Sequence, residues 1–327
     1  MQQEESSRFG FESTAAEVAA GVDLTGRVAV VTGGSGGLGA ESARVLASRG
    51  ARVLASRGAR VLIGARDVAK GNAVAAEIRS ATGNDAITVR ALELASLPSI
   101  RAFAAATLAS HPVIHVLLNN AGVMACPLGR TEQGFELQFG TNHLGHFLLT
   151  GLLAPALRAG APSRVVCVSS SGHRFGPVNL DDPNYQQRPY DKWEAYGQAK
   201  TANIWHALEV DRRLRADGVR GFALHPGAII TELGRHLKAE DREVMLARAP
   251  AGGFRWKKVE QGAATQVWAA TAPELAGRGG LYLEDCHIAG PSKELMSQVG
   301  YAPWALDAES AARLWPLSEQ LVGATFC

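Results

Sequence analysis

The chain has 327 residues, of which 46% are hydrophobic and 20% charged, and its formal net charge is +2. The length suits one large α/β domain, and the balance is that of an ordinary globular protein without the charge of a nucleic-acid or anionic-membrane binder. No apolar run approaches the roughly 18 residues that a membrane span requires.

The N-terminal segment, residues 1–22, begins with the polar and acidic run MQQEESSRFGFESTAAE. It resembles neither a secretory signal nor a transit peptide, and we expect a loose N-terminal arm. The cysteines are scattered and form no Cys-x-x-Cys pair, which predicts free thiols in a reducing, cytoplasmic environment. They are Cys126, Cys167, Cys286 and Cys327.

From Arg27 onward, short apolar runs alternate with stretches of helical length. Fully apolar strands separated by helices predict βαβ units and a parallel sheet covered on both faces. With right-handed crossovers, residues 23–327 should form one α/β domain, a doubly wound Rossmann fold of about seven strands. The expected strands are Val28–Gly33, Arg60–Ala65, Ala86–Leu92, Val113–Gly122, Arg164–Ser170, Val219–Gly227 and Gly279–Glu284.

The alternation of strands and helices lapses between Thr231 and Gly277. We expect a helical insertion here that acts as a lid over the substrate. Its apolar side chains suggest a bulky, apolar substrate. They are Leu233, Leu237, Met245, Leu246, Phe254 and Trp256.

The first motif is TGGSGGLG, which follows an apolar strand and opens a helical stretch. Glycine suits a backbone that turns sharply and approaches a pyrophosphate, and the helix N-terminus behind it offers free N–H groups. A glycine-rich turn can also serve only to pack a helix on a strand, but this context favours nucleotide binding. The cofactor-binding residues expected here are Thr32, Gly33, Ser35, Gly37, Leu38 and Gly39.

The second motif is YGQAK, which places Lys200 four residues after Tyr196. On a helix this spacing puts both side chains on one face. An ammonium group beside a phenol lowers the pKa of the tyrosine and makes it a usable general acid or base. An ordinary pair on a helix surface is the alternative, and the motif alone does not separate the two.

The third motif is a run of serines, Ser169, Ser170 and Ser171, at the carboxyl end of an expected strand. Open α/β sheets bind their ligands at that end, where a hydroxyl can hydrogen-bond a carbonyl or alcohol oxygen. A serine-rich turn without function is the alternative. A Ser-His hydrolase is a further alternative because His173 is close, but no G-x-S-x-G elbow surrounds the serines.

Together these motifs resemble the short-chain dehydrogenase/reductase family, and within it the retinol-dehydrogenase-like and WW-domain-oxidoreductase-like branch. The resemblance covers Val22 to Leu283. It also rests on NNAG after the fourth expected strand, on the asparagine of TNHLGHFLLT, and on HPGAIIT. The residues that these motifs add to the expected site are Asn119, Ala121, Gly122, Asn142, Pro226, Gly227 and Thr231.

The resemblance implies hydride transfer between a nicotinamide cofactor and an alcohol or carbonyl group. It implies that Tyr196 exchanges a proton with the substrate oxygen, that Lys200 lowers the tyrosine pKa and binds the nicotinamide ribose, and that Ser170 holds the same oxygen. It also implies that Asn142 holds a water in a proton relay that begins at Lys200. Catalysis would then consist of positioning and proton transfer.

The end of the second expected strand bears on the choice of cofactor. NAD-selective members of the family have an aspartate there, whereas this chain has Ala65 followed by Arg66. A guanidinium suits a 2′-phosphate, which favours NADP(H), although Arg66 could be a plain surface residue. Asp67 should cap the next helix. Glu93 stands where the family usually has an aspartate near the adenine, which leaves that contact open.

Two histidines and a tryptophan near these motifs invite other interpretations. We expect His143 and His146 to serve helix packing and polar contacts rather than metal binding, and the scattered cysteines form no zinc site. Trp193, three residues before Tyr196, could wall the active site.

The segment RVLASRGARVLASRGARVLIGARD repeats RVLASRGA without error. With one copy removed, the sequence is that of an ordinary helix, turn and strand of the family. The first copy should continue the helix from Gly39, and the third start should be the second strand. We therefore expect the middle copy, Arg52–Ala59, to loop out at the amino ends of the strands, away from the cofactor, because loop closure costs little more as a loop grows.

These observations predict an NADP(H)-preferring alcohol dehydrogenase or carbonyl reductase. An NAD-linked dehydrogenase of the same family and a nucleotide-sensing protein without catalysis are the alternatives. The helical stretches Thr131–Arg158 and Ala195–Leu214 correspond to those that pair in family dimers, so a homodimer is an expectation.

Overall fold

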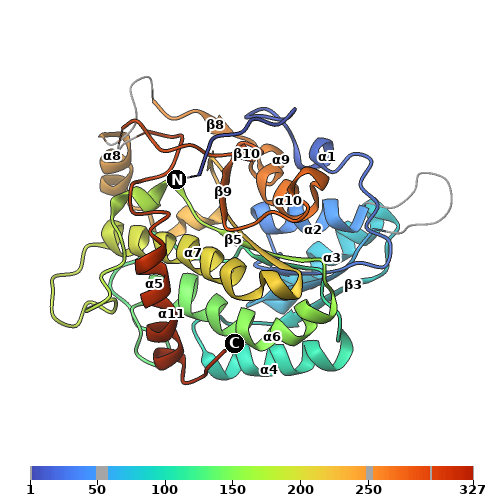
Figure 1. The fold of residues 1–327 in the computed structure, drawn as a ribbon, viewed down its shortest axis with the longest axis horizontal. Coiled ribbons are helices and arrows are strands. Elements are labelled where there is room, and N and C mark those ends of the chain that lie inside the picture. The colour runs from blue at the N-terminus through green and yellow to red at the C-terminus, as the bar shows by residue number, and fades with distance from the viewer. Residues whose placement is uncertain (1, 49–57, 248–252, 295–296, 327) are drawn as a thin grey trace.

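An eight-stranded sheet organises the computed structural model, which describes residues 2–48, 58–247, 253–294 and 297–326. The strand order is β10-β9-β6-β5-β4-β1-β2-β3 (Figure 1). Neighbouring strands from β3 to β9 are parallel, and β10 runs antiparallel to β9. The strands of this sheet are β1 (Val28–Thr32), β2 (Arg60–Ala65), β3 (Ile87–Ala91), β4 (Val116–Asn119), β5 (Ser163–Val168), β6 (Val219–His225), β9 (Leu281–Glu284) and β10 (His287–Ile288).

The α/β fold predicted from the sequence is confirmed, and all seven expected strands are present. The eighth, β10, was not predicted because it is only two residues long and has no apolar run of its own. It forms through a tight turn after β9, in which Asp285 and Cys286 both have positive φ. A second, two-stranded sheet pairs β7 (Ala228–Ile229) with β8 (Trp256–Lys257).

Helices cover both faces of the large sheet because its strands are buried on both sides. One core packs α4, α6 and α7 against the sheet, and the other packs α2, α3 and α10. The α-helices are α1 (Ala15–Val18), α2 (Gly37–Ser48), α3 (Val68–Thr82), α4 (Leu97–Ser110), α5 (Leu137–Phe139), α6 (Gly145–Ala159), α7 (Lys192–Leu214), α8 (Ala239–Ala247), α9 (Val259–Gly262), α10 (Ala264–Thr271) and α11 (Ala308–Val322).

The segment expected to form a lid divides into two parts. Its first part holds a 3-10 turn at Glu232–His236 and α8, which lies near the substrate cleft described below. The second part is not a lid. All eight residues of α10 are buried against the sheet, so this helix is the crossover between β6 and β9.

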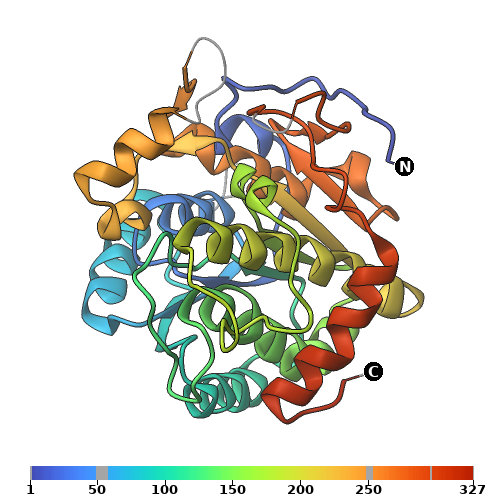
Figure 2. The same ribbon diagram turned by 90° about the vertical axis from the view of Figure 1, so that its left-hand side faces the viewer.

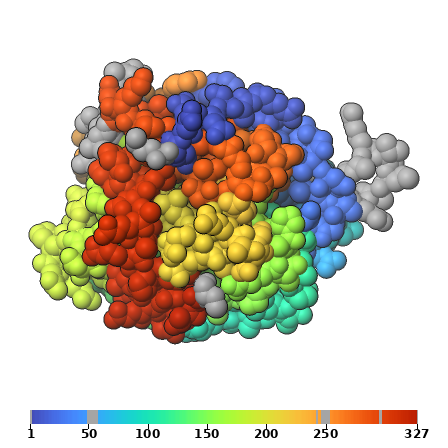
Figure 3. All heavy atoms as spheres, in the orientation of Figure 1, coloured from blue at the N-terminus to red at the C-terminus, as the bar shows by residue number. Residues whose placement is uncertain are grey.

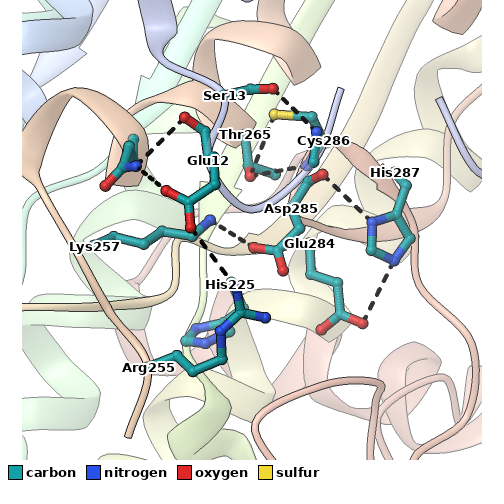
Figure 4. Close-up of polar contacts among 12 residues, drawn as sticks. Glu12, Ser13, His225, Arg255, Lys257, Thr265, Glu284, Asp285, Cys286 and His287 are labelled. Atoms are coloured by element: carbon teal, nitrogen blue, oxygen red, sulfur yellow. Dashed lines mark hydrogen bonds and ion pairs between the residues drawn. The ribbon is translucent and has the colours of Figure 1, made fainter. Parts of the chain in front are cut away.

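The N-terminal arm is not loose, which corrects the expectation from its polar composition. Glu5 pairs with Ile288 at the edge of β10, through backbone hydrogen bonds of 3.2 and 3.1 Å. Further along, Glu12 approaches Arg255 at 3.8 Å and accepts a hydrogen bond from Gln261 (Figure 4). The arm gains its order from the edge strand and from opposite charges on the neighbouring segment.

Residues on both sides of the repeat meet at the end of α2. This helix takes up the first copy as far as Ser48, and β2 is the third start of the repeat, as expected. The N–H of Ala59 donates to the carbonyl of Leu46 at 3.0 Å. A side chain at Gly58 would lie 1.9 Å from the carbonyl oxygen of Ala47. Residues 49–57, which include most of the middle copy, lie outside the described residues, so its expected looping out stays a prediction.

The C-terminal helix α11 packs on α7 and also contacts α6 (Figures 1–3). Leu314 and Trp315 are its large buried residues. This is the side that family dimers would use according to the sequence analysis, so part of the expected pairing surface is covered by the chain itself. The homodimer stays a prediction.

Within the described ranges, no helix is long and apolar enough to cross a membrane.

Candidate functional site

The glycine-rich turn between β1 and α2 has the shape that a pyrophosphate requires. A side chain at Gly39 would lie 2.4 Å from the carbonyl oxygen of Gly33, so the turn can close this tightly only with glycine. Gly37, with φ of +51°, opens α2, whose first turn carries no acidic side chain. Ser35 lies in the turn, and Leu38 packs toward Gly262 behind it. These features fit a dinucleotide held at a helix N-terminus.

The NNAG loop after β4 lies against this turn. The hydroxyl of Thr32 accepts hydrogen bonds from the N–H groups of Asn120 and Ala121, at 2.9 and 3.0 Å. The Asn120 amide donates to the carbonyl of Thr32 at 2.9 Å. A side chain at Gly33 would lie 3.0 Å from Ala121. The first motif and the NNAG loop therefore form one surface.

Asn119 is the last residue of β4. Its side chain is buried and donates to the Thr150 hydroxyl of α6 at 3.0 Å. The side chain therefore ties β4 to α6, and the expected contact of Asn119 with a cofactor stays a prediction. Asn120, which the sequence analysis quoted in NNAG without giving it a role, is the asparagine that contacts the glycine-rich turn.

Ser170, Tyr196 and Lys200 meet at the carboxyl end of β5. The hydroxyls of Tyr196 and Ser170 are hydrogen-bonded, and Ser170 also accepts from the N–H of Gly172 at 3.0 Å. Lys200 lies one turn further along α7, with its Nζ 5.7 Å from the centre of the Tyr196 ring. The other serines are engaged elsewhere: Ser169 donates to the carbonyl of Lys200, and the N–H of Ser171 donates to His225.

The expected lowering of the Tyr196 pKa is wrong for the protein alone. Burial raises the pKa of Tyr196 to about 12, and the hydrogen bond from Ser170 offsets only part of this effect. Lys200 does not compensate because its Nζ donates to the carbonyl of Val168 at 3.0 Å. Burial also lowers the pKa of Lys200 to about 8, so the amine is mostly charged at pH 7 and loses its charge above pH 8.

Asn142 lies in a π-helical turn, Gly140–Leu144, that precedes α6. Its side-chain oxygen accepts from the N–H of Val123 at 2.8 Å, and its amide donates to the carbonyl of Val123 at 2.9 Å. A side chain at Gly122 would lie 2.9 Å from the Asn142 oxygen and 3.7 Å from Lys200 Nζ. Asn142, Gly122 and Lys200 therefore lie close together, and the expected relay stays a prediction.

The HPGAIIT segment closes the other side of the site. Gly227, which follows Pro226, has φ of +104°, and a side chain there would lie 2.7 Å from Lys257. Thr231 caps the 3-10 turn at Glu232–His236 and faces the glycine-rich turn, where its methyl group would lie 3.6 Å from a side chain at Gly37. The two cofactor motifs thus face each other.

Arg66 and Glu93 lie together at the carboxyl ends of β2 and β3. Arg66 Nε is 4.0 Å from Glu93 Oε2, and the Arg66 side chain is 70% exposed. Lys70 is close by and forms an ion pair of 2.5 Å with Glu232. Asp67 caps α3 by accepting from the N–H of Lys70, as predicted. Two cations, each next to a carboxylate, therefore lie where a 2′-phosphate would bind in the expected binding mode.

An open cleft lies next to Ser170 and Tyr196. Trp193 is part of its wall, as anticipated, and Met245 and Phe254 are the two expected apolar residues that reach it. The Leu246 side chain lies outside the described residues. The cleft is lined by Met124, Ser170, Ser171, Gly172, Arg174, Phe175, Trp193, Tyr196, Val244, Met245, Phe254, Ser297 and Gln298.

The histidines near the site make polar contacts. His143 pairs with Ser318 of α11 at 2.8 Å, and His146 pairs with Thr32 at 2.9 Å. His173 lies 2.6 Å from the carbonyl of Ser170 rather than from its hydroxyl, so it is not placed as a hydrolase base. Among the residues that the structure describes, no group of three or more His, Cys, Asp or Glu could hold a metal ion.

Comparison with protein families gives a match over residues 27–242 to a model described as short chain dehydrogenase. Human retinol dehydrogenase 13 is 41% identical over 303 residues, which are 92% of this chain and 86% of that protein. Mouse retinol dehydrogenase 12 is also 41% identical, over 92% of this chain and 88% of that protein.

Solved structures share the architecture. An uncharacterised protein from Mycobacterium paratuberculosis gives a TM-score of 0.71 at 36% identity and covers 95% of this chain and 98% of its own. The Pseudomonas aeruginosa RhlG/NADP active-site complex gives a TM-score of 0.61 at 27% identity, over 80% of this chain and 95% of its own. The glycine-rich turn, the NNAG loop and the tyrosine–lysine helix all lie within residues 27–242, the range that matches the family model.

Proposed function

The chain belongs to the short-chain dehydrogenase/reductase family, and from this premise we propose that it is an NADP(H)-dependent oxidoreductase acting on an apolar alcohol or carbonyl compound. The observation that carries the proposal is the convergence of Ser170, Tyr196 and Lys200 beside an open cleft. When bound, the nicotinamide supplies the redox chemistry that no side chain can.

In this proposal, Tyr196 is the general acid in carbonyl reduction. Its raised pKa keeps the phenol protonated near neutral pH, so it can donate to a substrate oxygen in the cleft. Ser170, already bonded to the phenol, would hold the same oxygen. Lys200 would move from the Val168 carbonyl toward the cofactor ribose, and its positive charge would then favour the phenolate.

The preference for NADP(H) rests on Arg66. Its exposed guanidinium and the neighbouring Lys70 offer charge-assisted hydrogen bonds to a 2′-phosphate. The RhlG structure, which contains NADP according to its description, shows a related chain with that cofactor. Thr32, the glycine-rich turn and Thr231 would hold the rest of the dinucleotide.

The substrate class follows from the cleft wall. Met124, Phe175, Trp193, Met245 and Phe254 offer apolar surface, and the cleft is open to solvent on one side. Several relatives are named retinol dehydrogenases, which agrees with a long apolar alcohol or aldehyde. Burial of apolar surface would then supply most of the substrate affinity.

A panel of aldehydes tests the proposal, with absorbance of the reduced nicotinamide as the signal. We expect retinal and long-chain or aromatic aldehydes to be reduced with NADPH at a higher kcat/KM than short polar aldehydes. Each aldehyde is also measured with NADH. Equal use of both cofactors would support the NAD-linked alternative. Binding of NADPH without turnover on any member of the panel would support the sensing alternative.

A further inference from the structure

His146 is buried between two parts of the site and contacts both. Its Nδ1 lies 2.9 Å from the carbonyl oxygen of Asn142, and its Nε2 lies 2.9 Å from the hydroxyl of Thr32. The residue is 1% exposed. Its sequence context predicts helix packing and polar contacts, and nothing in the proposed proton transfer uses it.

The contacts of His146 fix where its proton lies. A carbonyl oxygen can only accept, so Nδ1 carries the proton and donates it to Asn142. Thr32 already accepts from the N–H groups of Asn120 and Ala121, which occupy both lone pairs of its hydroxyl oxygen. Its own O–H must therefore donate, and Nε2 of His146 is the nearest acceptor at 2.9 Å. Burial, aided by the charge of Lys200, lowers the pKa of His146 to about 4 and keeps the ring neutral.

These bonds close a ring around the NNAG loop. Thr32 holds the start of the loop through Asn120 and Ala121, and Asn142 holds its end through both backbone groups of Val123. His146 joins the two anchors. We propose that His146 is a positioning residue, which completes a hydrogen-bonded ring and thereby fixes residues 120–123 between the nucleotide-binding turn and Lys200.

The position of this loop matters for both halves of the site. On one side, Ala121 lies against Gly33 of the glycine-rich turn. On the other side, Gly122 lies next to Asn142 and Lys200. A loop freed from one anchor would shift against both neighbours. The consequence for the cofactor rests on the proposed function, whereas the ring itself is a property of the protein without any ligand.

Three substitutions at this position separate the two bonds. His146→Gln places an amide oxygen near the position of Nε2 and can keep the bond to Thr32. His146→Asn places an amide N–H near the position of Nδ1 and can keep the bond to Asn142. His146→Leu removes both. His143→Leu is the matched control, because His143 is equally buried but pairs with Ser318 of α11, outside the ring.

The first readout is amide hydrogen exchange of residues 119–123 in the protein without cofactor. We expect exchange at Asn120, Ala121 and Val123 to become at least about tenfold faster in His146→Leu and to stay unchanged in His143→Leu. The second readout is NADPH affinity by fluorescence titration. We expect about a tenfold loss for His146→Leu, since two hydrogen bonds are lost, and a smaller loss for His146→Gln. If His146→Leu does not fold, the Gln and Asn variants provide the same comparison.

Unchanged exchange in residues 119–123 of all three His146 variants would overturn the ring. Equal loss of NADPH affinity in His146→Leu and His143→Leu would reduce His146 to a packing residue and would also overturn it. If the wild type binds no NADPH but exchange responds as expected, the proposed function fails and the ring stands. If NADPH binds and is used but neither readout responds to His146, the ring fails and the function stands.

Discussion

The buried polar groups on the two sides of the active-site cleft differ in charge and in how completely they are hydrogen-bonded. On the nucleotide side, Thr32, Asn142 and His146 are neutral groups whose hydrogen bonds pair with backbone or with one another. On the substrate side, Arg174 and Glu284 are buried ionisable groups. Nε and Nη1 of Arg174 and Oε2 of Glu284 have no hydrogen-bond partner among the residues that the structure describes.

The difference indicates which side of the cleft is rigid and on which side buried groups lower the stability of the fold. Neutral, fully paired groups gain from a low dielectric, so the nucleotide side is rigid before any ligand arrives. Buried charges that are only partly paired cost stability instead. Arg174 donates to the carbonyl of Gly300, whereas Glu284 accepts from the N–H of Gly300 and lies 3.8 Å from His287 Nε2. The substrate side is therefore the part that substitutions and pH should alter most readily.

The largest effect is expected at the point where the two sides meet. Tyr196→Phe should lower kcat for carbonyl reduction by about 10²–10⁴-fold, because in the proposed function the phenol supplies the proton to the substrate oxygen. NADPH affinity should stay near that of the wild type, because the hydroxyl bonds Ser170 rather than the nucleotide-binding turn. Tyr301→Phe is the control, since its hydroxyl contacts only the backbone of Gln2 among the bonds described. Steady-state kinetics and NADPH titration measure both; near wild-type turnover in Tyr196→Phe would exclude the mechanism.

A smaller effect is expected on the nucleotide side. Arg66→Ala should weaken NADPH binding by roughly ten- to a hundredfold, the value of one charge-assisted hydrogen bond, and should leave NADH affinity nearly unchanged. Arg66→Lys keeps the charge but loses the planar fork, so its NADPH affinity should lie between the two. Titration of each variant with both cofactors provides the measurement. Equal losses for NADPH and NADH would mean that Arg66 does not read the phosphate.

The substrate side predicts an unusual dependence of stability on pH. Burial raises the pKa of Glu284 from 4.5 to about 7, so the folded protein binds a proton there that the unfolded chain has released. This stabilises the fold at low pH, and the contribution is lost as pH rises from 4.5 through 7. Glu284→Gln has no carboxyl to titrate and should not show this loss. The free energy of unfolding of the variant minus that of the wild type should therefore increase by up to about 3 kcal/mol from pH 4.5 to pH 8.

Glu209 is the matched control with the opposite sign. It is also buried, but ion pairs with Arg212 and Arg213 lower its pKa. Its contribution to stability is lost as pH falls, so Glu209→Gln should be most destabilising at neutral pH. Urea unfolding of the variants from about pH 3 to pH 8 provides the test, because the contribution of Glu209 is lost only below its ordinary pKa of 4.5. A pH-independent difference between wild type and Glu284→Gln would show that the Glu284 carboxyl titrates normally.

The smallest effect is expected for removal of the repeated segment. Deletion of Arg52–Ala59 gives the same sequence as deletion of residues 49–56, which joins Ser48 through Arg57 to Gly58. In the shortened chain, Leu46 and Ala59 become the first and last of six consecutive residues. The hydrogen bond from the N–H of Ala59 to the carbonyl of Leu46 is then the 6→1 bond of a Schellman motif, and Gly58 takes the C′ position, which favours glycine. Stability should change by less than about 1 kcal/mol.

The same deletion should leave the NADPH KM unchanged. The end of α2 lies at the amino ends of the strands, whereas Thr32 and Arg66 lie at their carboxyl ends. Thermal unfolding, size-exclusion elution and the NADPH KM of both forms give the comparison. A lower activity or a different elution volume would assign the repeat a role that its position does not suggest.

The sequence predicted the nucleotide side better than the substrate side, for a physical reason. The glycine-rich turn, NNAG and Tyr196 with Lys200 are local patterns, because each is dictated by one turn or one helix face. The substrate cleft joins residues as distant as Met124, Trp193, Phe254 and Gln298, and no local pattern records that proximity. The role of His146 was missed for the same reason, since its partner Thr32 lies 114 positions away.

The pKa of Tyr196 was misjudged because a spacing of four residues fixes the helix face but not the direction of a long side chain. Lys200 points to the Val168 carbonyl, and burial then dominates. The N-terminal arm was misjudged because its polar composition does not reveal the edge strand β10, with which Glu5 pairs.

The hydrogen bond between Leu46 and Ala59 makes this place a natural attachment point. Ala59 is bonded to Leu46 and Gly58 lies against Ala47, so the residues on the two sides of the repeat are held at the same spot. A fluorescent domain whose own termini lie close together could replace residues 49–57 without pulling α2 and β2 apart. Such a fusion would place the fluorescent domain at the amino ends of the strands, away from the proposed cofactor site at their carboxyl ends.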